Sequence, residues 1–141
     1  MFVDEFTVNA IDISKLENKP YKIGKVTNDV IKLLGLSIEE RDIVIWGDRI
    51  PHIERHKKDF ENECNYQTHI ESIPDIIANP DFVSVHPNGQ SIEYIKKIDE
   101  IVLVAVRIKI KGSLAIRTAY PIKQAKLDSY IESGRAKRLM D

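Results

Sequence analysis

Two histidines, His52 and His56, lie four positions apart in the segment PHIERH, which begins with Pro51. Proline suits the first position of a helix, because the N–H that it lacks has no partner there. Residues four apart on a helix lie on one face, so we expect two imidazoles that point in the same direction. An imidazole transfers protons near neutral pH and also binds metals. The spacing therefore indicates a proton-transfer site, a metal site or an ordinary exposed helix face.

The surroundings of these histidines favour proton transfer. The positive end of a helix dipole lowers the pKa of a histidine at the start of the helix, which keeps the imidazole neutral and able to act as a base. Arg55 and Lys57 flank His56 and are expected to lower its pKa in the same way. The segment predicts a general base in the first turns of this helix.

A zinc site is the competing interpretation. It would need a third ligand beside His52 and His56, and His69 or Glu71 could supply one. The metalloprotease pattern H-E-x-x-H is absent, because isoleucine follows the first histidine. The lone cysteine, Cys64, excludes an internal disulfide framework and a cysteine-rich zinc site. We therefore expect no metal and no cofactor.

Other polar residues give weaker signals. His69, within a predicted helix, and His86, just before the turn PNGQ, are expected to be surface residues or hydrogen-bonded structural residues. Lys96 ends a predicted strand, where a solvated side chain is the usual case and a phosphate contact is the alternative. Thr118 is a common residue type in strands, and its spacing alone indicates no catalytic role.

Length and composition indicate a globular protein. The 141 residues are enough for one domain with a sizeable core, and 43% are hydrophobic and 30% charged. No apolar run approaches the roughly 18 residues of a membrane span, and the acidic start MFVDEFTVNAIDIS does not resemble a signal peptide. The net charge of −1 hides a division, since residues 1–100 carry 12 basic and 19 acidic residues and residues 101–141 carry 9 and 3. This asymmetry indicates either a surface for a polyanion or a basic face that pairs with the acidic part.

The elements that must hold these residues follow an α+β order. Helical patterns come first and a run of β-branched and aromatic segments follows, with Asn88-Gly89 as a strong hairpin signal. Short connections favour a four-stranded antiparallel meander under the N-terminal helices, with a C-terminal helix. The predicted helices are 27–36, from Pro51 onward, 66–80 and 122–138; the predicted strands are a brief 42–46 and the meander strands 81–85, 90–97, 100–111 and 113–120.

Alternation divides the meander into two faces. The third meander strand is expected to turn one apolar set toward the helices: Val102, Val104, Val106, Ile108 and Ile110. Arg107, Lys109 and Lys111 fall on the opposite face, which is a plausible floor for a phosphate-bearing ligand. In the last strand Thr118 and Tyr120 share the register of apolar residues, whereas Arg117 points the other way.

Several segments together carry a family resemblance. HIERH, SIPDIIANPDFV, SIEYIKK, IVLVAVRI and LAIRTAY resemble the phage-associated barnase–EndoU–colicin–RelE-like nuclease group, in which an H…RH helix precedes an iP-x-iI-x-nPd segment and a sheet that ends in T-x-Y. The resemblance covers residues 25–138 of one domain, 1–141, with 1–24 as an N-terminal extension.

The resemblance implies a metal-independent ribonuclease, encoded by phages or mobile elements as a toxin or effector, that leaves a 2′,3′-cyclic phosphate. By this resemblance His56 is the general base or acid, and His52 assists it. Arg107 stabilises the phosphorane, Thr118 positions a phosphate oxygen, and Tyr120 is a second proton donor or a platform for a base. Three further residues are expected to bind substrate: Lys96, Lys109 and Arg117.

One condition follows from the alternation. Arg107 and Thr118 reach the same site only if a bulge re-aims the last strand or its end projects beyond the helices; otherwise Arg117 replaces Thr118. The expected partners are RNA, with tRNA as one option, and a cognate immunity or antitoxin protein, with no membrane. The expected location is the cytoplasm, or that of a target cell after delivery in a larger toxin. The alternative function is a non-catalytic module that binds RNA or protein.

Overall fold

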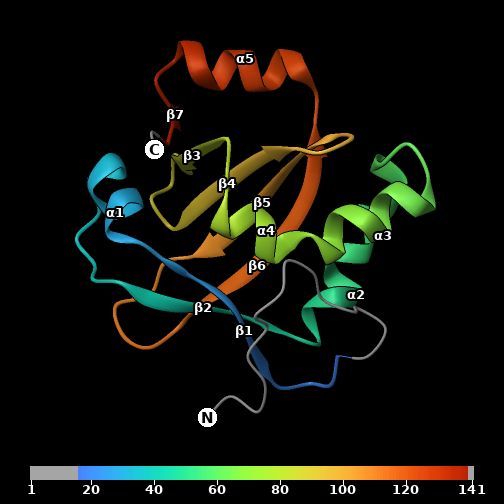
Figure 1. Cartoon of the computed structure of the whole chain (residues 1–141), viewed down its shortest axis with the longest axis horizontal. Coiled ribbons are helices and arrows are strands. Elements are labelled where there is room, and N and C mark those ends of the chain that lie inside the picture. Colours follow the sequence, from blue (N-terminus) through green and yellow to red (C-terminus); the bar gives the residue numbers. More distant parts are fainter. Residues whose placement is uncertain (1–15, 140–141) are drawn as a thin grey trace.

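A seven-stranded sheet runs through the protein, and a computed structural model describes it from residue 16 to residue 139 (Figure 1). The strand order is β1-β2-β6-β5-β4-β3-β7. The strands are β1 (Pro20–Val26), β2 (Arg41–Trp46), β3 (Phe82–Val85), β4 (Ser91–Lys97), β5 (Ile101–Arg107), β6 (Leu114–Ile122) and β7 (Ala136–Arg138). The helices are α1 (Asn28–Leu34), α2 (Arg49–Glu54), α3 (Glu63–Glu71), α4 (Ile73–Ala78) and α5 (Gln124–Glu132), with a 3₁₀ turn at Lys57–Asp59.

The predicted N-terminal extension and the acidic start, which does not resemble a signal peptide, lie largely outside the described residues. Residues 1–15 make up most of that extension and include the whole of that start. Strand β1 begins at Pro20, within the segment 1–24 assigned to the extension.

The predicted meander is confirmed, but it is only part of the sheet. Strands β3, β4, β5 and β6 pair antiparallel in chain order. The prediction of four strands was wrong because three more extend the sheet. The hairpin of β1 and β2 joins through a parallel pairing of β2 with β6, and β7 pairs with β3 at the other edge.

The order of the elements also differs from the expected sequence of helices followed by strands. Strands β1 and β2 alternate with α1 and α2, so the helices do not all precede the sheet. The predicted C-terminal helix 122–138 is shorter than expected: Gly134, with φ of 81°, follows its end, and β7 forms beyond it. A left-handed glycine is a common helix terminator, and it reverses the chain here.

Local capping explains the remaining boundaries. Helix α1 lies within the predicted range 27–36. It begins after Thr27, whose Oγ1 accepts a hydrogen bond from the Val30 N–H, and it ends at Gly35 with φ of 67°. The predicted helix 66–80 is divided at Ser72, and Pro74 lies in the first turn of α4, where its missing N–H costs no helical hydrogen bond. Within residues 16–139, every helix is too short or too polar to cross a bilayer.

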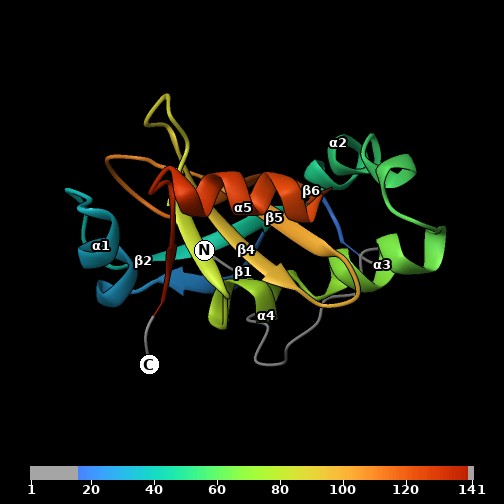
Figure 2. The ribbon, with the colours of Figure 1, turned by 90° about the horizontal axis from the view of Figure 1, so that it is seen from above.

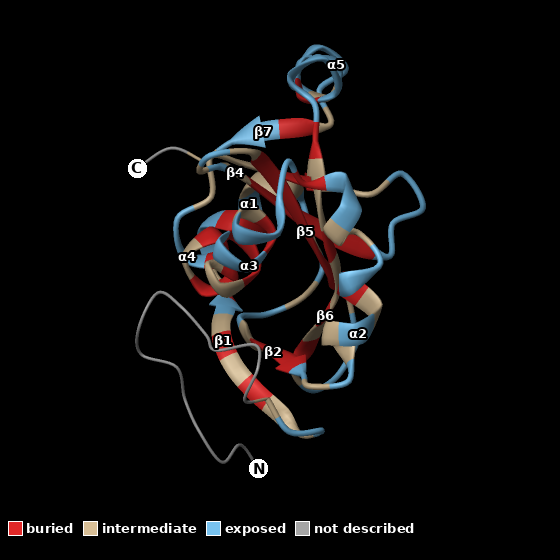
Figure 3. Ribbon diagram, turned by 90° about the vertical axis from the view of Figure 1, so that its right-hand side faces the viewer, coloured by how far each residue is buried: buried red, intermediate tan, exposed pale blue. Residues whose placement is uncertain are grey.

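Different helices cover the two faces of the sheet (Figures 2 and 3). Helices α1, α3 and α4 contribute to the main core, where the fully buried strand residues include Ile92, Tyr94, Val102, Val104 and Val106. Helix α5 packs through Leu127 on the other face, in a smaller cluster with Ile95, Leu103 and Ile122. Helix α5 covers one end of that face and does not reach the exposed Arg107 at the end of β5.

The predicted third meander strand ends earlier than expected. Strand β5 stops at Arg107, so Ile110 does not join the helix-covered face and is 86% exposed. A turn that contains Gly112, with φ of 77°, leads into β6. The Arg41 side chain, at the start of β2, donates a hydrogen bond to the carbonyl of Lys109 in this loop. The bond satisfies a backbone group that lacks a strand partner.

Candidate active site

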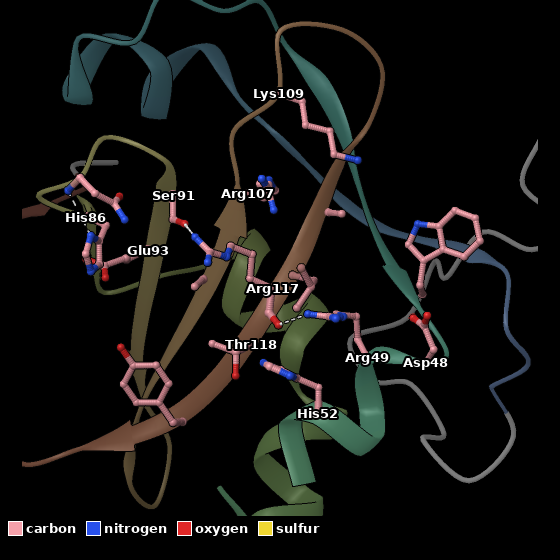
Figure 4. Close-up of a pocket in the computed structure, with 16 residues that line it drawn as sticks. Asp48, Arg49, His52, His86, Ser91, Glu93, Arg107, Lys109, Arg117 and Thr118 are labelled. Atoms are coloured by element: carbon pink, nitrogen blue, oxygen red, sulfur yellow. Dashed lines mark hydrogen bonds between the residues drawn. The ribbon is translucent and has the colours of Figure 1, made fainter. Parts of the chain in front are cut away.

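A pocket of about 700 Å³ opens on the face of the sheet that α5 leaves accessible (Figure 4). We call it the cationic pocket, because four basic side chains line it: Arg49, Arg107, Lys109 and Arg117. They come from α2, β5, the β5–β6 loop and β6. Its other polar and aromatic lining residues are Trp46, Asp48, His52, His86, Asn88, Ser91, Glu93, Thr118 and Tyr120.

A β-bulge in β6 brings the predicted residues into this pocket. Ala105 pairs with Thr118 and the next residue of β5, Val106, pairs with Ile116, so Arg117 is an extra residue on β6. The bulge exchanges the faces of the strand beyond it, because side chains alternate with a period of two. Thr118 and Tyr120 therefore share the pocket face with Arg107, and a bulge, one of the two expected ways of bringing them together, is present.

Two guanidinium groups of the pocket, those of Arg49 and Arg117, are held by hydrogen bonds. Arg49 donates from Nη1 to the Arg117 carbonyl at 3.1 Å. Arg117 in turn donates from Nη1 to the hydroxyl of Ser91 on β4 at 3.0 Å. Each bond uses one of the five N–H donors of a guanidinium and leaves others to bind an anion. This chain links α2, β6 and β4 around one concave surface with positive charge.

His52 lies in α2 and lines the cationic pocket (Figure 4). The turn before α2 passes close to the chain at Glu17, where a Cβ on Gly47 would collide with the Glu17 carbonyl. Partial burial and then the positive charges of Arg49 and Arg55 lower the pKa of His52 from its ordinary value of 6.5. The imidazole is therefore held neutral near neutral pH, as a general base must be.

The predicted stacking of His52 and His56 on one helix face was wrong. Helix α2 has six residues and ends at Glu54, so His56 lies beyond it at the start of the 3₁₀ turn. Pro51 is the third residue of α2 rather than its first. Because the helix is so short, His56 lies outside it and its side chain does not follow the helical alternation from His52. The spacing of the histidines alone did not indicate where the helix would end.

His56 does not line the cationic pocket, but it contacts a residue that does. Its Nδ1 lies 3.1 Å from the Asp59 carboxylate, and its ring centroid lies 5.2 Å from that of Tyr120. The side chain of His56 is 26% exposed. A carboxylate partner at this distance orients an imidazole. The pair of His56 and Asp59 therefore forms a support beside Tyr120.

Thr118 and Tyr120 lie on the pocket side of β6. The Thr118 Oγ1 is buried and makes no hydrogen bond to any described residue. A buried hydroxyl without a partner is costly, so this atom is prepared for a ligand. Burial, and then the nearby charge of Glu93, raise the pKa of the Tyr120 phenol, which keeps its proton in place.

Glu93 lies at the floor of the pocket with 1% of its surface exposed. It accepts a hydrogen bond from the Ser84 hydroxyl at 2.6 Å, and Arg135 donates to both of its carboxylate oxygens at 2.9 and 2.8 Å. The Arg135 guanidinium also lies 3.9 Å from the centroid of the Tyr130 ring. This network neutralises the carboxylate, so the pocket keeps its positive character.

His86 lines the pocket from the β3–β4 turn, where its Nδ1 accepts a hydrogen bond from the Asn88 N–H at 3.1 Å. This contact assigns the proton of the neutral ring to Nε2. Gly89, with φ of 74°, and the Asn88 side chain complete the turn, as the Asn-Gly signal predicted. His86 was expected to have a surface or structural role, and its position in the pocket adds a functional candidate.

The structure separates the remaining predicted residues. Lys109 and Arg117, both expected to bind substrate, line the cationic pocket. Lys96 does not; its Nζ donates to the Asn79 carbonyl at 2.7 Å, at the end of α4. Alternation along β4 places Lys96 with Tyr94 and Ile92, away from Ser91 and Glu93.

His69 has the structural role that was expected. It is fully buried, its Nδ1 donates to the Asn65 carbonyl at 2.6 Å, and its Nε2 accepts from the backbone N–H groups of Asp99 and Glu100. Both ring nitrogens are therefore used, and His69 does not serve as a third zinc ligand beside His52. Residues 16–139 contain no group of three or more His, Cys, Asp or Glu side chains that could hold a metal ion.

Sequence reasoning missed several residues of the pocket: Trp46, Asp48, Arg49, His86, Ser91 and Glu93. The polar positions Ser91 and Glu93 alternate with apolar ones in SIEYIKK, on the same face as Ile95. That period of two was the available signal. Nothing local indicated Trp46 or Arg49, because the parallel pairing of β2 with β6 joins distant parts of the chain.

Comparison with known proteins agrees with the geometry. The model of a family described as phage-Barnase-EndoU-ColicinE5/D-RelE like nuclease3 matches residues 21–129. No curated protein and no solved structure matches the chain. The matched range includes α2 and the strands that line the cationic pocket, and it confirms the resemblance predicted over residues 25–138. The chain belongs to this family of phage-associated barnase–EndoU–colicin–RelE-like nucleases.

Proposed function

We propose that the protein is a metal-independent endoribonuclease that cleaves RNA by transesterification and leaves a 2′,3′-cyclic phosphate. The observation that carries this proposal is the pocket that His52 lines together with three arginines, Arg49, Arg107 and Arg117. A base and a cluster of cations are what attack of a ribose 2′-hydroxyl on its neighbouring phosphate needs. RNA is favoured over DNA because only ribose carries that hydroxyl.

His52 is the general base of the proposed reaction. Its lowered pKa keeps Nε2 or Nδ1 available as an acceptor at neutral pH. The 2′-hydroxyl gives its proton to His52 while the 2′-oxygen forms a bond to phosphorus. This assignment exchanges the roles predicted from sequence, in which His56 was the base and His52 its assistant, because His52 lines the pocket.

The arginines stabilise the charge that develops on the phosphorane. Arg107 comes from β5 and Arg117 from the bulge of β6, so the two guanidinium groups approach from adjacent strands. Lys109 adds a third positive charge from the loop. The buried Thr118 hydroxyl donates to a phosphate oxygen and thereby gains the partner that it lacks. Fixed donors of this kind stabilise a transition state without reorganisation.

A proton donor completes the reaction when the bond from phosphorus to the 5′-oxygen breaks. Tyr120 holds its proton because of its raised pKa, and the His56–Asp59 pair supports it. His86 is the second candidate, since its Nε2 carries a proton. A variant Tyr120→Phe that retains turnover, beside a His86→Gln that loses it, would assign the acid to His86.

The family and the charge of the pocket support a wider proposal. A phage-associated nuclease with this chemistry acts as a toxin or effector on cytoplasmic RNA, with tRNA as one target, and a cognate immunity or antitoxin protein covers the pocket. The positive pocket favours an acidic surface on such a protein.

The test is incubation of the purified protein with total RNA in EDTA. We expect cleavage by the wild type, a loss of about 100-fold or more in His52→Ala, and no change in Lys96→Ala, a control whose side chain lies away from the pocket. Mass spectrometry identifies a cyclic phosphate because its mass is one water below that of the linear monophosphate. RNA that stays intact with wild type, or equal loss with His52→Ala, contradicts the proposal and favours a non-catalytic binding module.

A further inference from the structure

The only tryptophan of the chain, Trp46, lines the cationic pocket with 39% of its surface exposed. Three large hydrophobic side chains are exposed among the described residues: Trp46, Ile110 and Ile131. Of these, Trp46 is the one that lines the cationic pocket. A single exposed apolar side chain is common, but an indole in the lining of a cationic pocket offers a flat aromatic face to whatever binds there.

The strand explains why the indole points toward the pocket. Ile43 and Ile45 of β2 are fully buried in the main core under the helices. Side chains alternate along a strand, so Val44 and Trp46 belong to the opposite face. Val44 lies beside Ala115 of β6, which also lines the pocket. Trp46 is thus the last residue of β2 on the face that the pocket occupies.

The indole of Trp46 is not fixed by polar or ring contacts. Among residues 16–139 no side-chain hydrogen bond, ring contact or cation contact involves it, although the backbone of Trp46 lies opposite Pro20 in the pairing of β1 with β2. The two residues that follow the next glycine, Asp48 and Arg49, line the same pocket. The Arg49 guanidinium is fixed by its hydrogen bond to the Arg117 carbonyl. The Trp46 ring therefore belongs to a residue only three positions before an anchored cation of the same pocket.

We propose that Trp46 is a stacking platform for an unpaired nucleobase of the RNA, so that the site selects single-stranded or looped segments. This inference rests on the proposed ribonuclease function. The arginines hold the phosphate, and the adjacent nucleotide lays its base on the indole face. Stacking needs an unpaired base, because the faces of bases within a duplex are covered by their neighbours. An aromatic platform beside a cationic groove is a common design for single-stranded nucleic acids.

A binding experiment tests the platform without any need for cleavage. All tryptophan emission of the protein comes from Trp46, so its fluorescence reports on this site alone. The probes are short 2′-O-methyl RNA strands, which lack the attacking hydroxyl: one with all bases, one with abasic positions throughout, and one annealed to its complement. We expect saturable quenching by the first probe, and weak quenching by the other two.

Variants measure the contribution of the ring. With a dye-labelled 2′-O-methyl strand, Trp46→Ala is expected to weaken binding by about 5- to 100-fold, and Trp46→Phe to recover part of the loss. The matched control is Ile131→Ala, whose side chain is also 39% exposed but lies away from the cationic pocket. It should bind like the wild type.

The failures of the two proposals are distinguishable. Equal quenching by the abasic probe would contradict the stacking platform, and so would unchanged affinity and RNA turnover in Trp46→Ala. In either case, RNA cleavage by the wild type would still support the ribonuclease proposal. Such a result would leave the exposed indole to a protein partner instead. An absence of RNA cleavage, with saturable base-dependent quenching, would support the platform and contradict the ribonuclease.

Discussion

The two faces of the central strands carry different types of side chain. On β5, the side chains of Val102, Val104 and Val106 are fully buried under helices. The alternate positions run from Leu103, under α5, through Ala105 to Arg107, which is exposed in the cationic pocket. A single seven-residue strand therefore contributes to the core with one side and to the site with the other.

The difference teaches how a basic pocket can exist without a large cost in stability. Charged groups are expensive to bury, so they are placed on the side of the sheet that keeps contact with water. The helix-covered side supplies the apolar burial that stabilises the fold. We expect substitutions on the two sides to separate into effects on folding and effects on chemistry, with one exception.

The exception is Glu93, a buried charge on the accessible face. Replacement by glutamine leaves Arg135 without its carboxylate partner, and we expect a loss of about 3–5 kcal/mol in the free energy of unfolding, measured by urea denaturation. Glu132→Gln, at an exposed carboxylate of α5, should change stability by less than about 0.5 kcal/mol. If Glu93→Gln is as stable as wild type, the network does not support the pocket floor as we describe it.

Arg107→Ala should show the opposite behaviour. The side chain is exposed and lines the pocket, so we expect a fall of about 100-fold in kcat with the melting temperature nearly unchanged. Lys111→Ala, at an exposed residue of the same loop region that does not line the pocket, is the control. Cleavage kinetics on a short RNA and calorimetry provide the two readouts, and a stability loss as large as that of a core variant would contradict the division.

Ile92→Val removes one methylene from the helix-covered face. We expect a loss of about 1 kcal/mol in the free energy of unfolding, with kcat and KM unchanged for the folded fraction. The measurement combines denaturant titration with kinetics well below the melting temperature. A change in kcat would show that core packing on this side reaches the site through β4.

The smallest expected effect is a shift in the pH profile. If His52 is the base, the acid limb of kcat/KM should have a pKa below 6.5, because burial and the arginines disfavour the imidazolium. Removal of a positive charge by Arg55→Gln should raise that pKa toward 6.5. Lys58→Gln, an exposed lysine that does not contribute to the shift, should leave it in place. An unmoved acid limb in Arg55→Gln would remove His52 from the assignment.

The parts of the fold that the sequence predicted are those with local signals. The turn at Asn88-Gly89 and the alternation of β4 and β5 identified the meander. The conflict between Arg107 and Thr118 left two solutions, of which the structure has the bulge. Strand β7 was missed because three residues after a glycine carry too little pattern to outweigh a basic helix. The position of the hairpin of β1 and β2 depends on a pairing between residues about 70 positions apart, which no local pattern encodes.

The site was predicted in part for a related reason. Arg107, Lys109, Arg117, Thr118, Tyr120 and His52 do line one pocket. His56 does not, because α2 ends before it, earlier than the histidine spacing indicated. Lys96 does not, because the alternation of β4 places its side chain on the helix-covered side of the sheet. The alternation in SIEYIKK was an available signal for Glu93, whereas Trp46 could be recognised only once the tertiary structure had placed it beside the cations.

The extra residue of β6 makes one cation of the site removable without disturbing its neighbours on the strand. Ile116 pairs with Val106 and Thr118 pairs with Ala105, so a chain without Arg117 would pair regularly here and keep the threonine and the tyrosine on the pocket face. Deletion of Ala119 would act differently, because it would move Tyr120 to the side that Ala119 now occupies in the hydrophobic interior. A change of length at the bulge therefore alters only the charge of the pocket, whereas the same change two residues later removes a ring from it.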